Sequence, residues 1–122
     1  MKRLLFLVVL VSFIIFATPP AIAEDTVKIG GVYPLSGYLS WLGEYYKKAG
    51  LIQIDMINEN GGIKGKKVEL VIYDDQSTPQ EAARATQRLI SKDQVIGITG
   101  TATAPITGAV ASLAGKYGVP AV

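Results

Sequence analysis

The 122-residue sequence contains no cysteine and no histidine. Without cysteine the chain has no disulfide and no thiolate metal ligand, and without histidine it lacks the commonest metal ligand and general base. Catalytic triads, zinc sites and histidine-based acid catalysis are therefore excluded within this chain. We expect no metal site and no cofactor. The missing cysteine also excludes a lipid-modified N-terminal cysteine.

Long apolar runs are scarce except at the N-terminus. Two basic residues precede an apolar run over Leu4–Ala17, and Ala21 and Ala23 follow in a small-x-small cleavage pattern. This run of 14 residues is short of the roughly 20 that a membrane-spanning helix needs. Residues 1–23 are therefore predicted to be a cleavable signal peptide. Residues 24–122 would be exported to a periplasmic or other extracytoplasmic compartment.

The mature part has no excess of either charge. The signal segment takes two of the twelve basic residues and none of the ten acidic ones, which leaves ten of each. A basic surface that would attract nucleic acid is not indicated, so no nucleic-acid partner is expected.

The mature chain alternates strand-like and helix-like segments. Strands are predicted over 26–33, 68–75, 94–99 and 119–122. Helices are predicted over 40–60, 77–90 and 105–118. The second helix begins with a capping box formed by Thr78 and Glu81 around Pro79. This order predicts an α/β fold in three layers, a parallel sheet with helices on both faces.

Apolar spacing predicts which faces are buried. The first helix repeats apolar residues at three- and four-residue steps, at Leu42, Tyr45, Ala49, Ile52 and Met56. The second helix has a comparable stripe, at Ala82, Ala85, Thr86, Leu89 and Ile90. The second strand becomes continuously apolar, which predicts burial on both of its faces.

The candidate site lies where the third strand meets the third helix. Gly100 allows a close backbone approach, and Thr101 and Thr103 add hydroxyls beside the unpaired N–H groups that open a helix. Such a junction can hold a carboxylate. In the alternative interpretation, Thr103 only caps the helix and the alanines pack on the sheet. The loop lacks the lysine of a nucleoside-triphosphate loop, and a dinucleotide fingerprint would belong after the first strand.

Two further features have competing interpretations. Trp41, the only tryptophan, opens the first helix and is either an aromatic wall for a ligand or a packing residue. Asp74 and Asp75 are the only paired carboxylates that follow a strand. Strand-end capping and surface charge are favoured for them over acid–base chemistry.

Together these segments resemble a known family. The stretches "VKIGGVYPLSG", "INENGGIKGKKVELVIYDDQSTPQEA" and "VIGITGTATAPITGAVASLAGKYGVPAV" are similar to the leucine/isoleucine/valine-binding family of periplasmic substrate-binding proteins, which serve ABC transporters. The resemblance implies a type I periplasmic binding fold with two lobes that close on a small solute. Residues 24–122 would be the N-terminal part of the first lobe, and the second lobe would be absent.

The resemblance also implies function and site residues. A member of the family is not an enzyme; it binds a branched-chain or other amino acid, or a related carboxylate, and delivers it to a membrane permease. The ligand carboxylate would be bound by the loop after the third strand, at Gly100, Thr101, Ala102 and Thr103. The start of the first helix would line the pocket at or beside Ser40, Trp41 and Leu42. Two alternatives stay open: a ligand-sensing receptor ectodomain on the same fold and an exported α/β enzyme.

Overall fold

The computed structural model describes residues 25–122, so the predicted signal peptide lies outside the described residues. The strands within this part are β1 (Val27–Tyr33), β2 (Val68–Asp74) and β3 (Ile98–Gly100). The helices are α2 (Ser40–Glu59), α3 (Pro79–Arg88), a π-helical turn η1 (Leu89–Asp93) and α4 (Ala104–Lys116). Between residues 25 and 122, no helix combines the length and the apolar character needed to cross a membrane.

The strands form a parallel sheet in the order β2-β1-β3. β1 pairs with β2 along its whole length and with β3 near its C-terminal end, where Val32 lies opposite Gly100. The predicted fourth strand is present as a short stretch beside β3, since Ile98 forms a bridge with Ala121.

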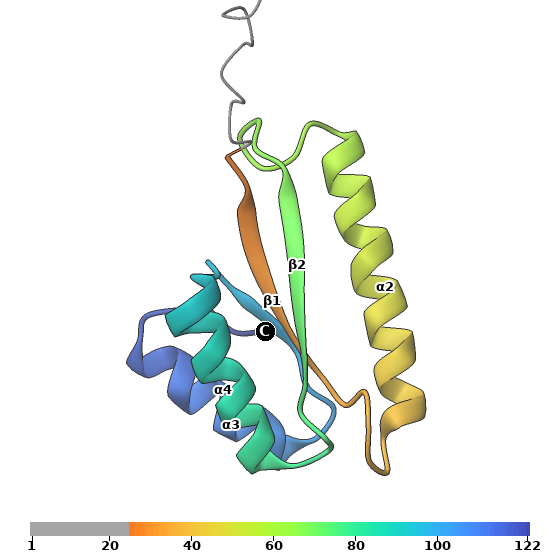
Figure 1. Ribbon diagram of the computed structural model, residues 1–122, viewed down its shortest axis with the longest axis vertical. Coiled ribbons are helices and arrows are strands. Elements are labelled where there is room, and N and C mark those ends of the chain that lie inside the picture. The colour runs from red at the N-terminus through yellow and green to blue at the C-terminus, as the bar shows by residue number, and fades with distance from the viewer. Residues whose placement is uncertain (1–24) are drawn as a thin grey trace, which may run out of the picture.

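Helices cover both faces of this sheet, as predicted (Figure 1). α2 packs on β1 and β2, whereas α3 and α4 pack on each other and cover the opposite face. The main core lies between the sheet and this helix pair, with Val32, Leu89, Ile98, Ile106 and Val110 all buried. The stripe predicted for the second helix is confirmed, because four of its five members are buried and Ile90 packs against the core.

The predicted buried face of the first helix is wrong. Tyr45, Ile52 and Met56 are 65%, 61% and 52% exposed, so this apolar stripe faces away from the sheet. The helix instead presents Gly50 to the sheet and Gly43 to the loop that follows β1. A Cβ on Gly43 would lie 2.1 Å from the Pro34 carbonyl oxygen, which shows how closely the helix backbone approaches the β1–α2 loop. Glycine has no side chain, so it allows this close backbone packing but adds nothing to the apolar pattern. The pattern therefore predicted burial of the opposite, exposed face of α2.

Burial of β2 on both faces is also wrong. Only Val68 is buried among its residues, because β2 is an edge strand whose single neighbour in the described sheet is β1.

Two segment boundaries differ from the predictions. Helical structure after α3 continues through η1 to Asp93 and ends at Gln94, which has a left-handed φ of 57°. β3 therefore begins only at Ile98 and not at Gln94. At the start of α3, the Thr78 side chain accepts a hydrogen bond from the Glu81 N–H at 3.3 Å, so the predicted cap is present. The reciprocal half of the capping box is not formed, because the Thr78 N–H donates to the Asp75 carbonyl at 2.9 Å and the Glu81 carboxylate pairs with Arg84.

Candidate functional site

The predicted site residues lie at the edge of the sheet where the parallel strands end (Figure 1). Ser40, Trp41 and Leu42 form the first turn of α2, which follows β1. Gly100 ends β3, and Ala102 and Thr103 lead into α4. Because β1 and β3 are neighbours, the fold brings both predicted segments to one edge of the sheet. Ligands of open parallel sheets bind at this edge.

The junction between β3 and α4 has an unusual backbone. Gly100 has φ 114° and Thr101 has φ 85°. A positive φ is a steric outlier for a β-branched residue such as threonine. Thr101 is held there by its N–H, which donates to the Val32 carbonyl at 2.9 Å. Strained backbone of this kind concentrates at binding and catalytic sites, which favours a functional interpretation of the junction.

Backbone N–H groups at the start of α4 have no hydrogen-bond acceptor among residues 25–122. Thr103 occupies the N-cap position, but its side chain makes no capping hydrogen bond. The interpretation of Thr103 as a side-chain helix cap is therefore wrong. In residues 25–122, the N–H groups of Ala102, Thr103 and Ala104 are not paired with an acceptor. Together with the positive end of the helix dipole, they can hold an anionic group.

A hydroxyl pair that sequence reasoning missed adjoins this junction. The Oγ1 atoms of Thr101 and Thr107 are 2.6 Å apart, and the Thr107 hydroxyl donates to the Thr103 carbonyl at 2.9 Å. Thr107 follows Thr103 by four residues, and a threonine hydroxyl inside a helix often bonds the carbonyl four residues earlier. That spacing was the available sequence signal, but the contact with Thr101 depends on the tertiary fold.

Trp41 is 63% exposed, so it does not pack in the core of the described part of the chain. Ser40 and Leu42 on either side of it are half-buried. The indole thus stands in solvent at the end of the sheet where the strands terminate, and it is available as an aromatic wall.

Asp74 fastens the loop that leads into α2. Its Oδ1 accepts hydrogen bonds from the N–H groups of Leu35 at 2.9 Å, Ser36 at 3.1 Å and Gln76 at 2.8 Å. Its Oδ2 accepts from the Ser36 hydroxyl at 2.6 Å. Partial burial raises the pKa of Asp74, but these hydrogen bonds together outweigh it, so the pKa lies below its ordinary value.

Ser77 adds a second fastening to the same loop. Its hydroxyl accepts from the Leu39 N–H at 3.2 Å and donates to the Ser36 carbonyl at 2.9 Å. The strand-end capping predicted for Asp74 is confirmed. The consequence that sequence reasoning missed is that Asp74 and Ser77 position the start of α2.

Asp75 is fully buried, which corrects its interpretation as a surface charge. Its Oδ1 accepts from the Ser77 N–H at 2.7 Å, while its Oδ2 has no partner in the described structure. Burial raises the pKa of this carboxyl, and the charge of Asp74 adds to the effect, although the Ser77 hydrogen bond opposes it.

The cavity beside the hydroxyl pair is small. It has a volume of about 60 Å³ and is lined by Gly100, Thr101, Thr107, Val110, Ala111, Ala121 and Val122. Small-molecule pockets usually measure about 300–1,000 Å³. This cavity is therefore too small to enclose such a molecule.

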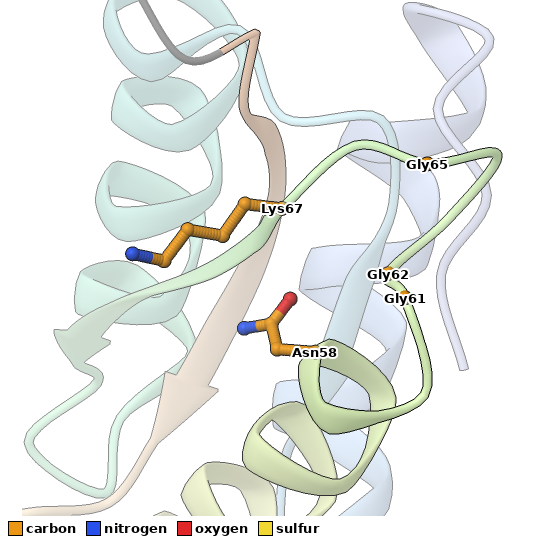
Figure 2. A pocket seen from close by; sticks show the side chains of 5 residues that line it. All are labelled: Asn58, Gly61, Gly62, Gly65 and Lys67. Carbon is orange, nitrogen blue, oxygen red and sulfur yellow. The ribbon is translucent and has the colours of Figure 1, made fainter.

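A larger hollow of about 350 Å³ adjoins the turn between α2 and β2, next to Asn58 and three glycines (Figure 2). The Asn58 side chain is fully engaged, since it accepts from the Val68 N–H at 2.7 Å and donates to the Val68 carbonyl at 2.9 Å. Figure 2 shows the Lys67 side chain extending away from the glycines. This hollow is a structural feature of the turn.

Neither hollow is lined by a metal-binding cluster. Over residues 25–122, no group of three or more acidic, histidine or cysteine side chains could hold a metal ion.

Comparison with known proteins identifies the family of this chain. A family profile described as "Periplasmic binding protein" matches residues 26–122, nearly the whole described chain. The chain belongs to the periplasmic binding protein family. Among curated members, it is 34% identical over 110 residues to Leu/Ile/Val-binding protein homolog 7 of Brucella suis, covering 90% of this chain and 27% of that protein.

Solved structures of periplasmic binding proteins resemble the fold of this chain. The branched-chain amino acid transporter substrate-binding protein LivJ of Streptococcus pneumoniae, in complex with isoleucine, is 38% identical with a TM-score of 0.75, covering 79% of this chain and 28% of that one. An ABC transporter solute-binding protein of Rhodopseudomonas palustris, in complex with 3,4-dihydroxybenzoic acid, is 33% identical with a TM-score of 0.71, covering 80% and 26%. The chain thus spans about a quarter of the length of these periplasmic binding proteins.

Proposed function

We propose that residues 24–122 are the N-terminal part of the first lobe of an extracytoplasmic solute-binding protein of an ABC transporter. The complete protein, which we take to have the length of its relatives, binds a small carboxylate such as a branched-chain amino acid. It then delivers this solute to a membrane permease and catalyses no reaction. The signal-peptide pattern at residues 1–23 supports export.

One observation supports the proposal: the strained junction of Gly100, Thr101, Ala102 and Thr103 lies at the strand-end edge of the sheet and has N–H groups without an acceptor among residues 25–122. A carboxylate is the solute group that such donors bind. The two ligands named for the similar solved structures, isoleucine and 3,4-dihydroxybenzoic acid, share a carboxylate. Trp41 supplies an exposed aromatic surface at the same edge.

Two lobes are needed in this proposal. The wall formed by residues 25–122 leaves a cavity of about 60 Å³, far below the volume of an amino-acid pocket. The second lobe would supply the opposing wall, and closure of the lobes would bury the solute.

Calorimetry and thermal shift on the complete protein test the proposal, with aliphatic amino acids and aromatic acids as solutes. We expect one solute class to raise the melting temperature in a concentration-dependent way. Thr103→Ala should weaken that binding by about tenfold, because it removes a hydroxyl donor to a charged group. Ser91→Ala is the matched control, since the Ser91 hydroxyl bonds the Gln87 carbonyl away from the site. Absence of a shift with every acid would contradict the proposal.

A further inference from the structure

An apolar seam runs along the side of α2 that residues 25–122 leave uncovered. It consists of Tyr45, Ala49, Ile52 and Met56, all of which are exposed. They are spaced by four, three and four residues, the alternation that brings apolar side chains onto one line in a coiled coil. Contiguous exposed apolar patches mark interaction surfaces.

The layered fold argues against cover of this seam by another element of the same lobe. Gly50 faces the sheet, and Ile52 lies two residues further along, about half a turn around the helix. The seam therefore points away from the sheet, on the outer side of α2 (Figure 1). In a fold with one layer of helices on each face of the sheet, a further helix lies on the sheet beside α2. The outer side of α2 is left to a second molecule.

Charges beside the seam indicate which molecule fits. Lys48 and Asp55 are exposed on the same side of the seam, seven residues or about two turns apart. Neither forms an ion pair within residues 25–122. When two copies of α2 pack antiparallel, each flank faces the same flank of the other copy, so Lys48 of one lies opposite Asp55 of the other. Parallel packing would instead place each of these charges opposite its own like charge.

The apolar residues are self-complementary in the same antiparallel arrangement. The register that pairs Lys48 with Asp55 places the small Ala49 of one helix against Ile52 of the other. It also places Tyr45 against Met56, and a thioether beside an aromatic ring is a favourable contact. Each contact occurs twice, as expected for an interface with twofold symmetry.

We propose that α2 packs antiparallel on α2 of a second copy of this chain, so that the complete protein forms a twofold-symmetric dimer. This inference goes beyond the proposed function and does not depend on solute binding. A single helix pair buries less surface than a standard protein interface, so the dimer is weak. It forms at high protein concentration and is dissociated in dilute solution.

Sedimentation velocity of the complete protein over a series of concentrations tests the dimer. We expect the sedimentation coefficient to rise with concentration toward the value for a dimer. Ile52→Ser should weaken the association by about tenfold or more, because it removes apolar contact from both copies at once. Leu51→Ser is the matched control, since Leu51 is also exposed on α2 but lies outside the seam. It should associate like the unmodified protein.

Two charge variants test the partner and its orientation. Lys48→Asp sets acidic residues opposite each other across the seam, and Asp55→Lys sets lysines opposite each other. Each variant alone should therefore be monomeric. An equimolar mixture of the two should associate again, because every acidic position then faces a lysine, and added salt should weaken this association. Recovery on mixing is expected only if the partner is a second copy in the antiparallel orientation.

Three results would overturn the proposal. The first is a complete protein that stays monomeric at every concentration; a loss of several kcal/mol of unfolding stability in Ile52→Ser would then assign the seam to another segment of the complete chain. The second is a dimer that Ile52→Ser leaves unchanged, and the third is a mixture of the charge variants that does not associate. If Ile52→Ser does not fold, the charge variants decide, because Lys48 and Asp55 are exposed.

Discussion

The ring of Tyr33 occupies the space that a side chain on Gly100 would need. A Cβ on Gly100 would lie 2.5 Å from Cδ1 and Cε1 of that ring and 2.5 Å from the Val32 carbonyl oxygen. Gly100 also has φ 114°, a conformation that residues with a side chain rarely adopt. The end of β3 can therefore meet the buried tyrosine only through glycine.

Gly100→Ala should destabilise the fold by about 2 kcal/mol or more, from backbone strain and overpacking together. Gly108→Ala is the control, because Gly108 lies inside α4 with open space at its Cβ. It should stabilise the chain by about 0.5–1 kcal/mol through helix propensity. Urea unfolding measures both variants. Equal effects would contradict the packing of Tyr33 against Gly100.

Thr78 and Thr103 both occupy N-cap positions, but only Thr78 makes the capping hydrogen bond. Thr78→Ala should therefore cost about 1 kcal/mol of unfolding free energy. Thr103→Ala should cost less than about 0.5 kcal/mol, as a surface change without a cap does. Thermal unfolding without a solute compares them, and a larger loss for Thr103→Ala would show that its hydroxyl does cap α4.

Asp74 and Asp75 should affect the pH dependence of stability in opposite ways. The folded pKa of Asp74 is lowered, so its stabilising contribution is present above the unfolded value of about 3.9 and is lost as pH falls through the folded value. The folded pKa of Asp75 is raised, so its contribution is complete below that unfolded value and is lost as pH rises through the folded value.

Denaturant titrations between about pH 3 and pH 8 test these signs with two asparagine variants. The stability advantage of the unmodified protein over Asp74→Asn should shrink toward low pH. Relative to Asp75→Asn, the unmodified protein should gain stability toward low pH. The same trend for both variants would contradict the assignment of a lowered pKa to the hydrogen-bonded Asp74 and a raised pKa to the buried Asp75.

Because the apolar stripe of α2 is exposed, substitutions of Ile52 and Leu89 should differ in their effect on stability. Ile52 is 61% exposed, whereas Leu89, the first residue of η1, is fully buried in the core. Ile52→Ser should change stability in this chain by no more than about 0.5 kcal/mol, and Leu89→Ala should cost about 2–5 kcal/mol. Both variants are measured by urea unfolding. A cost of several kcal/mol for Ile52→Ser would show that the apolar stripe of α2 is buried, as the apolar spacing predicted.

Features specified by local chemistry were predictable from the sequence. The order of strands and helices follows from apolar periodicity, and the Thr78 cap involves only residues three apart in the chain. The placement of the two predicted segments at one edge of the sheet also followed, because parallel strands bring their carboxyl ends together there.

Features that depend on tertiary packing were not predictable in this way. Apolar spacing gives a stripe but does not show that Gly43 allows close approach to the loop after β1 and Gly50 close approach to the sheet. The burial of Asp75 depends on the neighbouring loop, and adjacent aspartates look alike in sequence. Thr101, which contacts Thr107, has a positive φ. A positive φ is not expected for a β-branched residue, so the sequence did not predict this conformation.

The hydrogen bonds that Asp74 and Ser77 make to residues 35–39 join protein groups to one another and order this loop without any contribution from a solute. Immobilising a flexible segment costs about 1–2 kcal/mol of conformational entropy per residue, and a segment that is already ordered avoids that cost. Trp41, at the start of α2, thus follows a loop that is already ordered. Under the proposed function, a solute would meet a surface that these bonds already order, and the entropy cost of binding would fall on the parts of the complete protein that close over it.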